Sequence, residues 1–210
     1  VWAVGYSQDT GGENLTLTLH WDGTAWTQIA SPSPGTISSG LYGVTALASN
    51  NVWAVGWTKP SSTVFNTLVL HWDGTAWTEV ASPSPGAATS MLYAVSAVSA
   101  NDIWAAGWQD SSVMIQHWDG TAWTVSPAGA GGQFYAIDAV SANDVWAVGF
   151  TSGNPRQTLT MHWDGANWSL VTSPNNGTGN NFLYAVAGVP GADVWAGGMY
   201  RAAPNSFNLM

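Results

Sequence analysis

The stretch VWAVG at residues 52–56 and the stretch HWDG at residues 71–74 decide the fold, because both recur along the chain. VWAVG, or a near copy of it, begins at Val1, Val52, Ile103, Val145 and Val194. HWDG begins at His20, His71, His117 and His162. Self-similarity at a regular period is typical of repeat proteins, in which each unit buries its apolar surface against its neighbours. The sequence therefore predicts a single repeat domain over residues 1–210.

Each repeat unit is predicted to contain four β-strands. A unit begins at a Leu-Tyr or Phe-Tyr pair, which gives units 1–40, 41–91, 92–133, 134–182 and 183–210, the first and last being partial. The strand-like runs are rich in Val, Leu, Trp, Tyr and Thr and are bounded by Gly, Pro, Asn and Ser. In the second unit they cover residues 41–48, 52–58, 67–72 and 76–81. Helical periodicity and capping signals are missing, so we expect an all-β protein.

Two kinds of connection alternate between these strands. The first and second strands, and the third and fourth, are joined by short turns of constant sequence. In the HWDG turn, the Asp-Gly pair is expected to supply the positive φ values of a tight hairpin. The remaining loops vary in length and are rich in Pro, Ser and Gly. In an antiparallel sheet the two kinds of connection lie at opposite ends, so one face of the protein should be uniform and the other variable. Binding surfaces usually lie on variable loops.

Four-stranded units of about 40 to 50 residues fit the blades of a β-propeller. The combined pattern VWAVG…HWDG…W resembles bacterial Trp-rich β-propeller repeats, which are similar in style to WD40, kelch and Asp-box propellers. The chain lacks the Gly-His pair of WD40 repeats and the Ser that precedes the Asp of an Asp box, so no catalytic residue carries over. The repeats number four to five units in this chain. The resemblance implies a secreted or cell-surface bacterial protein, in some members a long tandem array.

The two end units are predicted to form incomplete blades. The first supplies strands at residues 1–6, 15–21 and 25–30, and the last at residues 183–189, 194–200 and 206–210. An unpaired strand edge favours pairing with another chain. We therefore expect partners to be copies of the protein or adjacent repeats of the same polypeptide. The alternatives are a closed five-bladed ring with two three-stranded blades, or a truncated chain.

Composition excludes several classes of partner. Only 7% of residues are charged, and the net charge of −9 arises from 12 acids against Lys59, Arg156 and Arg201. So few cations exclude a nucleic-acid footprint. No apolar run approaches the roughly 20 residues that span a bilayer, so membrane insertion is not expected. Cysteine is absent, which removes disulfides, thiolate metal sites and thiol nucleophiles.

The recurring polar residues are predicted to support the scaffold. A His or Asp that occurs at one position of several blades is held apart from its copies by the radial arrangement. We therefore expect no metal site, no cofactor and no catalytic group, since no Ser-His-Asp set or carboxylate pair is marked either. The residues assigned to this structural motif are His20, Trp21, Asp22, His71, Trp72, Asp73, His117, Trp118, Asp119, His162, Trp163 and Asp164.

Aromatic residues at the variable face are the better candidates for binding. They end the second strands or begin the first strands of the units, namely Tyr6, Trp57, Trp108, Phe150, Tyr42, Tyr93, Tyr135 and Tyr184. Packing between blades is the competing explanation, because each ring buries a large apolar area. The sequence thus predicts a non-enzymatic structural or adhesive module of an extracellular or cell-surface assembly. The alternative is a glycan-binding lectin that uses the variable face.

Overall fold

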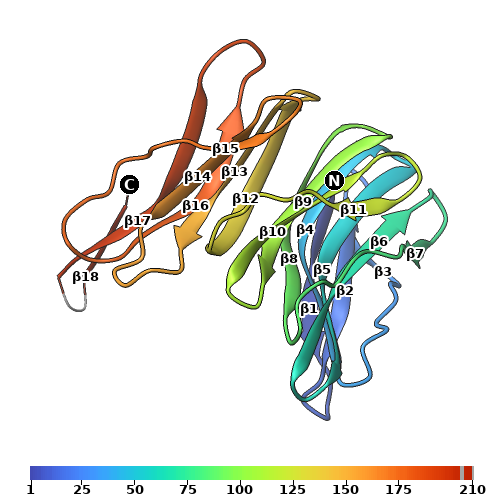
Figure 1. Cartoon of the computed structure of the whole chain (residues 1–210). Helices are drawn as coiled ribbons and strands as arrows, with labels where there is room; N and C mark the ends of the chain where they lie inside the picture. The colour runs from blue at the N-terminus through green and yellow to red at the C-terminus, as the bar shows by residue number, and fades with distance from the viewer. Residues whose placement is uncertain (204–205, 210) are drawn as a thin grey trace.

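The computed structural model describes residues 1–203 and 206–209. Within that part of the chain every regular element is a β-strand (Figure 1). The strands form five antiparallel sheets, called sheets 1 to 5 in chain order. Sheets 2, 3 and 4 have four strands, and sheets 1 and 5 have three. The predicted all-β, antiparallel architecture is confirmed.

The strands of each sheet pair in chain order. Sheet 1 consists of β1 (Trp2–Gln8), β2 (Asn14–Trp21) and β3 (Trp26–Ile29). Sheet 2 consists of β4 (Ser38–Ala48), β5 (Asn51–Ser61), β6 (Val64–Trp72) and β7 (Trp77–Glu79). Sheet 3 consists of β8 (Ser90–Ser99), β9 (Asp102–Gln109), β10 (Ser112–Trp118) and β11 (Trp123–Val125). Sheet 4 consists of β12 (Gly132–Ser141), β13 (Asp144–Thr151), β14 (Thr158–Trp163) and β15 (Trp168–Leu170). Sheet 5 consists of β16 (Asn181–Gly188), β17 (Val194–Ala203) and β18 (Ser206–Leu209).

The fourth strand of a unit is shorter than the sequence predicts. In sheet 2 we expected residues 76–81, but β7 ends at Glu79. Beyond it the chain turns around the side chain of Thr67, whose Oγ1 lies 2.7 Å from Ser82 Oγ and 3.1 Å from the Pro83 carbonyl oxygen. The Val80 N–H still donates to the Val69 carbonyl at 2.9 Å, so the ladder stops where the chain turns toward Thr67. The last predicted strand reached Met210, which lies outside the described residues.

The HWDG turn differs from the expected hairpin. In sheet 1, four residues separate the paired Trp21 and Trp26, and only Gly23 has a positive φ, of 110°. The Asp22 carboxylate instead accepts hydrogen bonds from the Thr24 hydroxyl and backbone N–H, both at 2.7 Å. These donors, the Thr24 hydroxyl first, lower the pKa of Asp22 to about 2. The prediction that both residues of the Asp-Gly pair adopt positive φ was therefore wrong, because the aspartate closes the turn with its side chain.

A β-bulge occurs at one tyrosine in the first strand of each of sheets 2 to 5. In β4 the register with β5 shifts between Leu41 and Gly43, so Tyr42 has no partner residue. The same shift occurs at Tyr93, Tyr135 and Tyr184. A bulge redirects the extra side chain and bends the strand. The bend brings the Gly40 carbonyl against Gly56, the glycine of VWAVG, where an added Cβ would overlap with it.

One tryptophan contact recurs between successive sheets. In sheets 1 to 3, the strand that contains the VWAVG stretch carries a tryptophan, here called the wedge tryptophan, that packs against two tryptophans of the next sheet, here called the tryptophan pair. Trp53 is a wedge, with ring centroids 5.0 Å from Trp118 and 5.8 Å from Trp123. The same contact joins Trp2 to Trp72 and Trp77, and Trp104 to Trp163 and Trp168. The apolar core lies in these layers between sheets.

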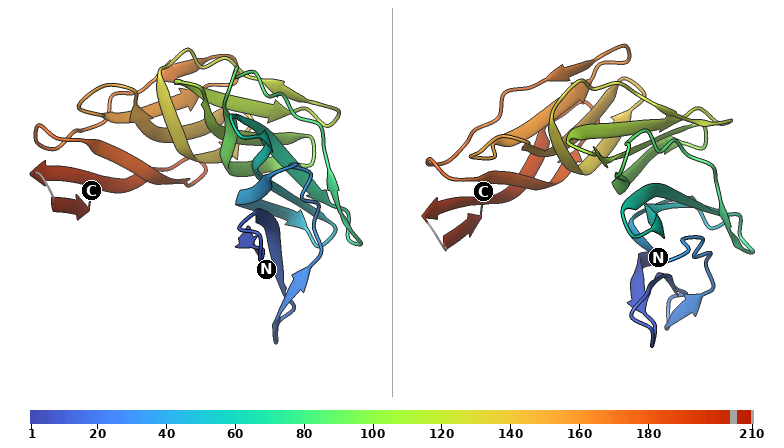
Figure 2. Two further views of the ribbon diagram at one scale, coloured as in Figure 1. Left: turned by 90° about the horizontal axis from the view of Figure 1, so that it is seen from below. Right: turned by 60° about the horizontal axis from the view of Figure 1, so that its bottom comes forward.

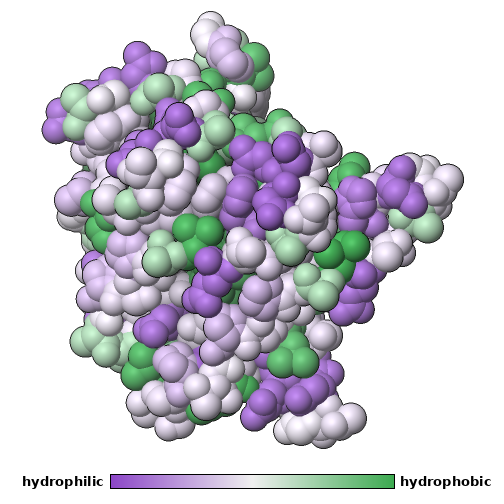
Figure 3. All heavy atoms as spheres, turned by 90° about the vertical axis from the view of Figure 1, so that its right-hand side faces the viewer, coloured by the Kyte–Doolittle hydropathy of each residue, from purple (hydrophilic) through white to green (hydrophobic). Residues whose placement is uncertain are grey.

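The five sheets follow an open arc, with sheets 1 and 5 at its two ends (Figure 2). Contacts between strands join each sheet to the next, through the pairs β1–β4, β4–β8, β8–β12 and β12–β16. A closed ring of five blades, one of the alternatives raised by the sequence, is not what the described residues form. On the side shown in Figure 3, hydrophilic and hydrophobic residues are interspersed over the surface. Among the described residues, no helix is long and apolar enough to cross a membrane.

Candidate functional site

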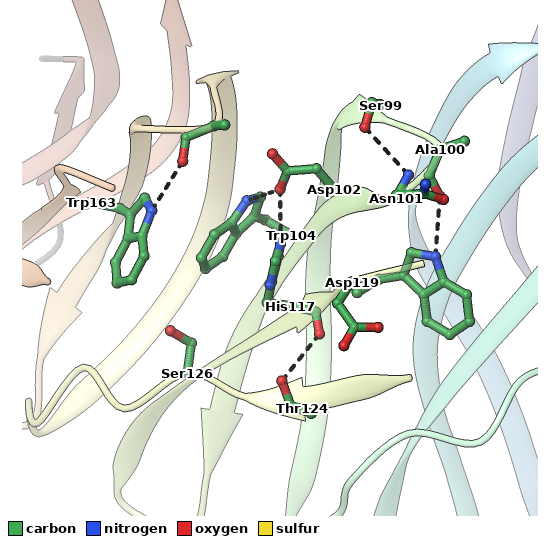
Figure 4. A network of polar contacts seen from close by, with 12 residues as sticks. Ser99, Ala100, Asn101, Asp102, Trp104, His117, Asp119, Thr124, Ser126 and Trp163 are labelled. Carbon is green, nitrogen blue, oxygen red and sulfur yellow. Dashed lines mark hydrogen bonds and ion pairs between the residues drawn. The ribbon is translucent and has the colours of Figure 1, made fainter. Parts of the chain in front are cut away.

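Three of the four HWDG histidines, His71, His117 and His162, are held by the turn between the first two strands of their own sheet. In sheet 3, Asp102 Oδ1 accepts hydrogen bonds from Trp104 Nε1 and His117 Nε2, both at 2.8 Å (Figure 4). The indole and imidazole rings stack with centroids 4.1 Å apart. The same arrangement joins Asn51 to Trp53 and His71 in sheet 2, and Asp144 to Trp146 and His162 in sheet 4. Because a carboxylate only accepts, His117 Nε2 must carry the proton.

The other polar groups of the motif also bond within their own sheet. Trp118 Nε1 donates to the Ala100 carbonyl at 3.2 Å, and Asp119 Oδ1 accepts from the Thr121 hydroxyl at 2.6 Å. The ring of His20 packs against that of Trp2, with centroids 4.7 Å apart and an angle of 42° between the ring planes. Burial lowers the pKa of His71, so its ring is neutral at pH 7. No group of three or more His, Cys, Asp or Glu in the described part of the chain could hold a metal ion.

The bulged tyrosines form a continuous row across the sheets. The centroid of each ring lies 5.0 Å from that of the next ring in the row, in the order Tyr42, Tyr93, Tyr135 and Tyr184. Tyr6, at the end of β1, meets the row at 6.5 Å from Tyr42. Burial raises the pKa of Tyr93 to about 12 and that of Tyr42 above its ordinary value. These hydroxyls therefore stay protonated and can donate as well as accept.

A cavity of about 640 Å³ opens beside this row, between sheets 1, 2 and 3. Five of the eight aromatic residues singled out in the sequence line it, namely Tyr6, Tyr42, Trp57, Tyr93 and Trp108. Its polar wall comes from the loop at residues 11–14 and from Ser38 and Lys59. The volume is within the range of small-molecule sites, about 300–1,000 Å³. The structure thus brings these rings together at one hollow.

The aromatic residues of the cavity are not equally accessible. Tyr42 is 42% exposed, whereas Trp57 is 5% exposed and packs against Gly40. Trp57 Nε1 makes no hydrogen bond within the described part of the chain. Its N–H nevertheless faces the Tyr42 hydroxyl, and this lowers the pKa of Tyr42 in part against the larger, raising effect of burial. Trp57 therefore shapes the wall, and the tyrosines offer the free ring surface.

A second, smaller hollow of about 170 Å³ lies between sheets 3 and 4. Trp108 and Phe150 line it, and Phe150 itself is buried. The Arg156 guanidinium lies 4.6 Å from the centroid of the Phe150 ring. Tyr135 and Tyr184 lie farther along the row, where Tyr135 contacts Phe150 at 5.6 Å.

Several residues of these hollows escaped the sequence reasoning. Lys59 lies over the Phe65 ring at 5.1 Å, and both line the larger cavity together with Glu13. Glu13 lies in the loop before β2, Lys59 near the end of β5 and Phe65 near the start of β6, where the sequence differs between units, so no repeat pattern marks them. Asp110 was also missed: its carboxylate accepts three backbone N–H groups from residues 87–89, at 2.8–3.1 Å. Its φ of 49° is one that Asp tolerates better than most residues.

Comparison with known proteins bears on the fold. No family model matches the sequence, and a search of curated proteins found no match. A solved structure described as a fungal lectin of Aleuria aurantia with a six-bladed β-propeller fold is 14% identical. Its match covers 99% of this chain and 72% of that one, with a TM-score of 0.57.

Two further structures are similar in the same way. An Aleuria aurantia lectin in complex with Fucalpha1-6GlcNAc is 13% identical over 93% of this chain and 66% of that one, with a TM-score of 0.56. YCF48 bound to D1 peptide is 13% identical over 99% and 63%, with a TM-score of 0.55. The chain thus spans less than two thirds of the length of each of these two structures. At this level of identity the likeness shows the fold alone, which is that of a β-propeller.

Proposed function

We propose that this protein is a non-enzymatic, extracellular or cell-surface lectin that binds a carbohydrate in the cavity between sheets 1, 2 and 3. The observation that carries the proposal is the cavity itself, about 640 Å³ in volume and lined by tyrosines in a row. This proposal corresponds to the alternative raised by the sequence. A purely structural role would not call for a hollow on the face formed by the variable loops.

The chemistry of the cavity suits a sugar. A pyranose ring presents apolar C–H groups on its faces and hydroxyls around its edge. The exposed ring of Tyr42 and the accessible part of the half-buried ring of Tyr93 can contact the apolar face. Glu13 from the β1–β2 loop, Asn14 at the start of β2 and Lys59 near the end of β5 line the same cavity and supply both donors and acceptors. Carbohydrate is thus favoured over a fully apolar ligand, which would leave these polar groups unpaired.

The similar structures support the proposal at the level of the fold. The Aleuria aurantia structures are described as lectins, one of them in complex with a fucosylated disaccharide. The YCF48 structure is described with a bound peptide, so peptide binding is the second candidate. Membership of the Trp-rich repeat family stays a prediction, since no family model matches.

The test is a glycan array with the labelled chain, followed by calorimetry with the glycan that is best retained. Tyr42→Ala and Tyr93→Ala should each weaken binding at least tenfold, which is about 1.4 kcal/mol. The matched control is Tyr184→Ala, which removes a tyrosine from the same bulge position, 40% exposed but absent from the residues that line the cavity. Its affinity should stay within about twofold of wild type, a difference under about 0.5 kcal/mol.

Two results would overturn the proposal. One is that the array retains no glycan. If the protein binds a peptide instead, peptide binding becomes the function of the cavity. The other is an equal loss of affinity in all three variants, which would place the ligand away from sheets 1 to 3. Near-ultraviolet circular dichroism of each variant checks that its fold is retained.

A further inference from the structure

Arg156 is the one cation that lines the smaller hollow, between sheets 3 and 4. The chain has 12 acids against three cations, so an arginine without an acidic partner does not result from a shortage of acids. Within the described part of the chain, the Arg156 guanidinium nevertheless forms no ion pair and donates no hydrogen bond. Its N–H groups are therefore available to a ligand.

The position of Arg156 is fixed at both its backbone and its guanidinium. Its backbone N–H donates to Asn180 Oδ1, and its carbonyl oxygen accepts from the Asn181 N–H, both at 2.8 Å. The guanidinium lies over the Phe150 ring, 4.6 Å from its centroid, and 5.9 Å from the centroid of Phe182. A cation that is already held in place loses less rotamer freedom when a ligand binds.

Asp110 lines the same hollow but does not pair with this arginine. Its carboxylate accepts the backbone N–H groups of Ala87, Ala88 and Thr89 at 2.8–3.1 Å. These bonds, that of Thr89 first, lower the pKa of Asp110, so the carboxylate is ionised at pH 7 and stays with its own donors. An acid and a base thus share one small hollow without forming an ion pair, which leaves the guanidinium for an acceptor from outside the chain.

The smaller hollow is a neighbour of the larger cavity and is too small to hold a whole ligand. Its volume of about 170 Å³ is below the range of small-molecule sites, which starts at about 300 Å³. Trp108 lines both the hollow and the cavity. The tyrosine row also leads from Tyr93 in the cavity to Tyr135, whose hydroxyl lies 3.4 Å from Oε1 of Gln133 in the hollow. The hollow thus suits one group of a ligand whose remainder lies in the cavity.

We propose that the smaller hollow binds the anionic group of an acidic glycan, a carboxylate or a sulfate ester, whose neighbouring sugars lie in the larger cavity. The planar guanidinium of Arg156 can donate two parallel N–H bonds to such an oxyanion. The hydroxyls of Ser111 and Ser152 line the same hollow and can donate to its remaining oxygen atoms. The net charge of −9 does not prevent this, because exposed charges beyond about 8 Å are screened at physiological ionic strength. The inference rests on the proposed lectin function and adds the class of glycan.

The experiment compares an acidic glycan with its neutral counterpart, in which the carboxyl group is reduced to an alcohol or the sulfate is removed. An array that carries carboxylated, sulfated and neutral glycans shows which anion is retained, and calorimetry then gives the two affinities. Wild type should bind the acidic member at least about tenfold more tightly, because a charged pair strengthens the hydrogen bonds. Arg156→Gln should bring the two affinities within about twofold of each other by weakening the acidic member alone.

Lys59→Gln is the matched control, because it removes the same charge from a cation that lies over an aromatic ring in the larger cavity. It should keep the preference for the acidic member. Equal wild-type affinities for the two members overturn this inference and leave the proposed function standing, as does a preference that survives Arg156→Gln or is lost in Lys59→Gln. An array that retains no glycan overturns both. Near-ultraviolet circular dichroism checks the fold of the variants, and the wild-type comparison needs no variant.

Discussion

The glycine of VWAVG provides a direct test of the bulged first strand, because the chain contains the same glycine with and without that strand. In sheet 3 a Cβ added to Gly107 would overlap with the carbonyl oxygen of Met91 and lie 2.9 Å from Leu92 Cα. In sheet 1 no first strand covers Gly5, and an added Cβ meets nothing within 4 Å. One methyl group should therefore have opposite effects at two equivalent positions.

The size of the effect follows from what must move. At Gly107 the obstacle is backbone, so the two strands must separate. Overpacking of this kind costs about 1–3 kcal/mol, and each weakened ladder hydrogen bond adds about 1 kcal/mol. We expect Gly107→Ala to lower the free energy of unfolding by about 3 kcal/mol, and the melting temperature by about 6–12 °C for a chain of this size. Gly5→Ala should instead stabilise the protein by about 0.5–1 kcal/mol, since Gly carries an entropic penalty within a strand.

Urea denaturation of both variants, followed by tryptophan fluorescence and far-ultraviolet circular dichroism, measures the two free energies. Coincident transitions from the two probes are needed before a single free energy is extracted. Equal destabilisation by both substitutions, or a Gly107→Ala variant as stable as wild type, would refute the close approach of the bulged strand to this glycine.

Two further predictions concern the polar turns. The pKa of Asp73 is lowered to about 2, first by the hydroxyl of Thr75, so its carboxylate favours the folded state above the ordinary pKa of 3.8. Stability should therefore fall as the pH drops from about 4 to 2, and Asp73→Asn should flatten this fall in acid titrations monitored by circular dichroism. Asp102→Ala leaves two ring N–H donors without their acceptor and should cost about 2–4 kcal/mol. Asp102→Asn should cost less than about 1 kcal/mol, because Asn51 already fills this role in sheet 2; similar losses in urea denaturation of the two variants would contradict this.

The repeat made most of the strands predictable, because each pattern was seen several times. The β-bulge was not predictable, since Tyr42 follows Leu41 as any strand residue would, and only the register with β5 reveals the extra residue. The four-residue HWDG turn was missed for a related reason. Asp-Gly is compatible with two turns, and the acceptor role of the Asp22 side chain decides between them.

The candidate site was predictable as a face but not as a cavity. The alternation of constant turns and variable loops placed Tyr42 and Trp57 at the same end of the sheet. Their different exposure depends on Gly40, which lets the Trp57 indole pack closely against the backbone. Lys59 and Phe65 enter the cavity from the adjoining ends of β5 and β6, where the sequence has no repeat pattern. Such contacts depend on how three sheets meet, which no single unit of the sequence encodes.

The wedge and the pair lie on opposite sides of one sheet, and residues for both occur in each of the first four units. A unit duplicated in tandem therefore arrives with surfaces that fit both of its new neighbours. The gene can gain or lose whole units by recombination without having to evolve a new interface each time. The variable loops take no part in this tryptophan contact, so they are free to diverge after each duplication.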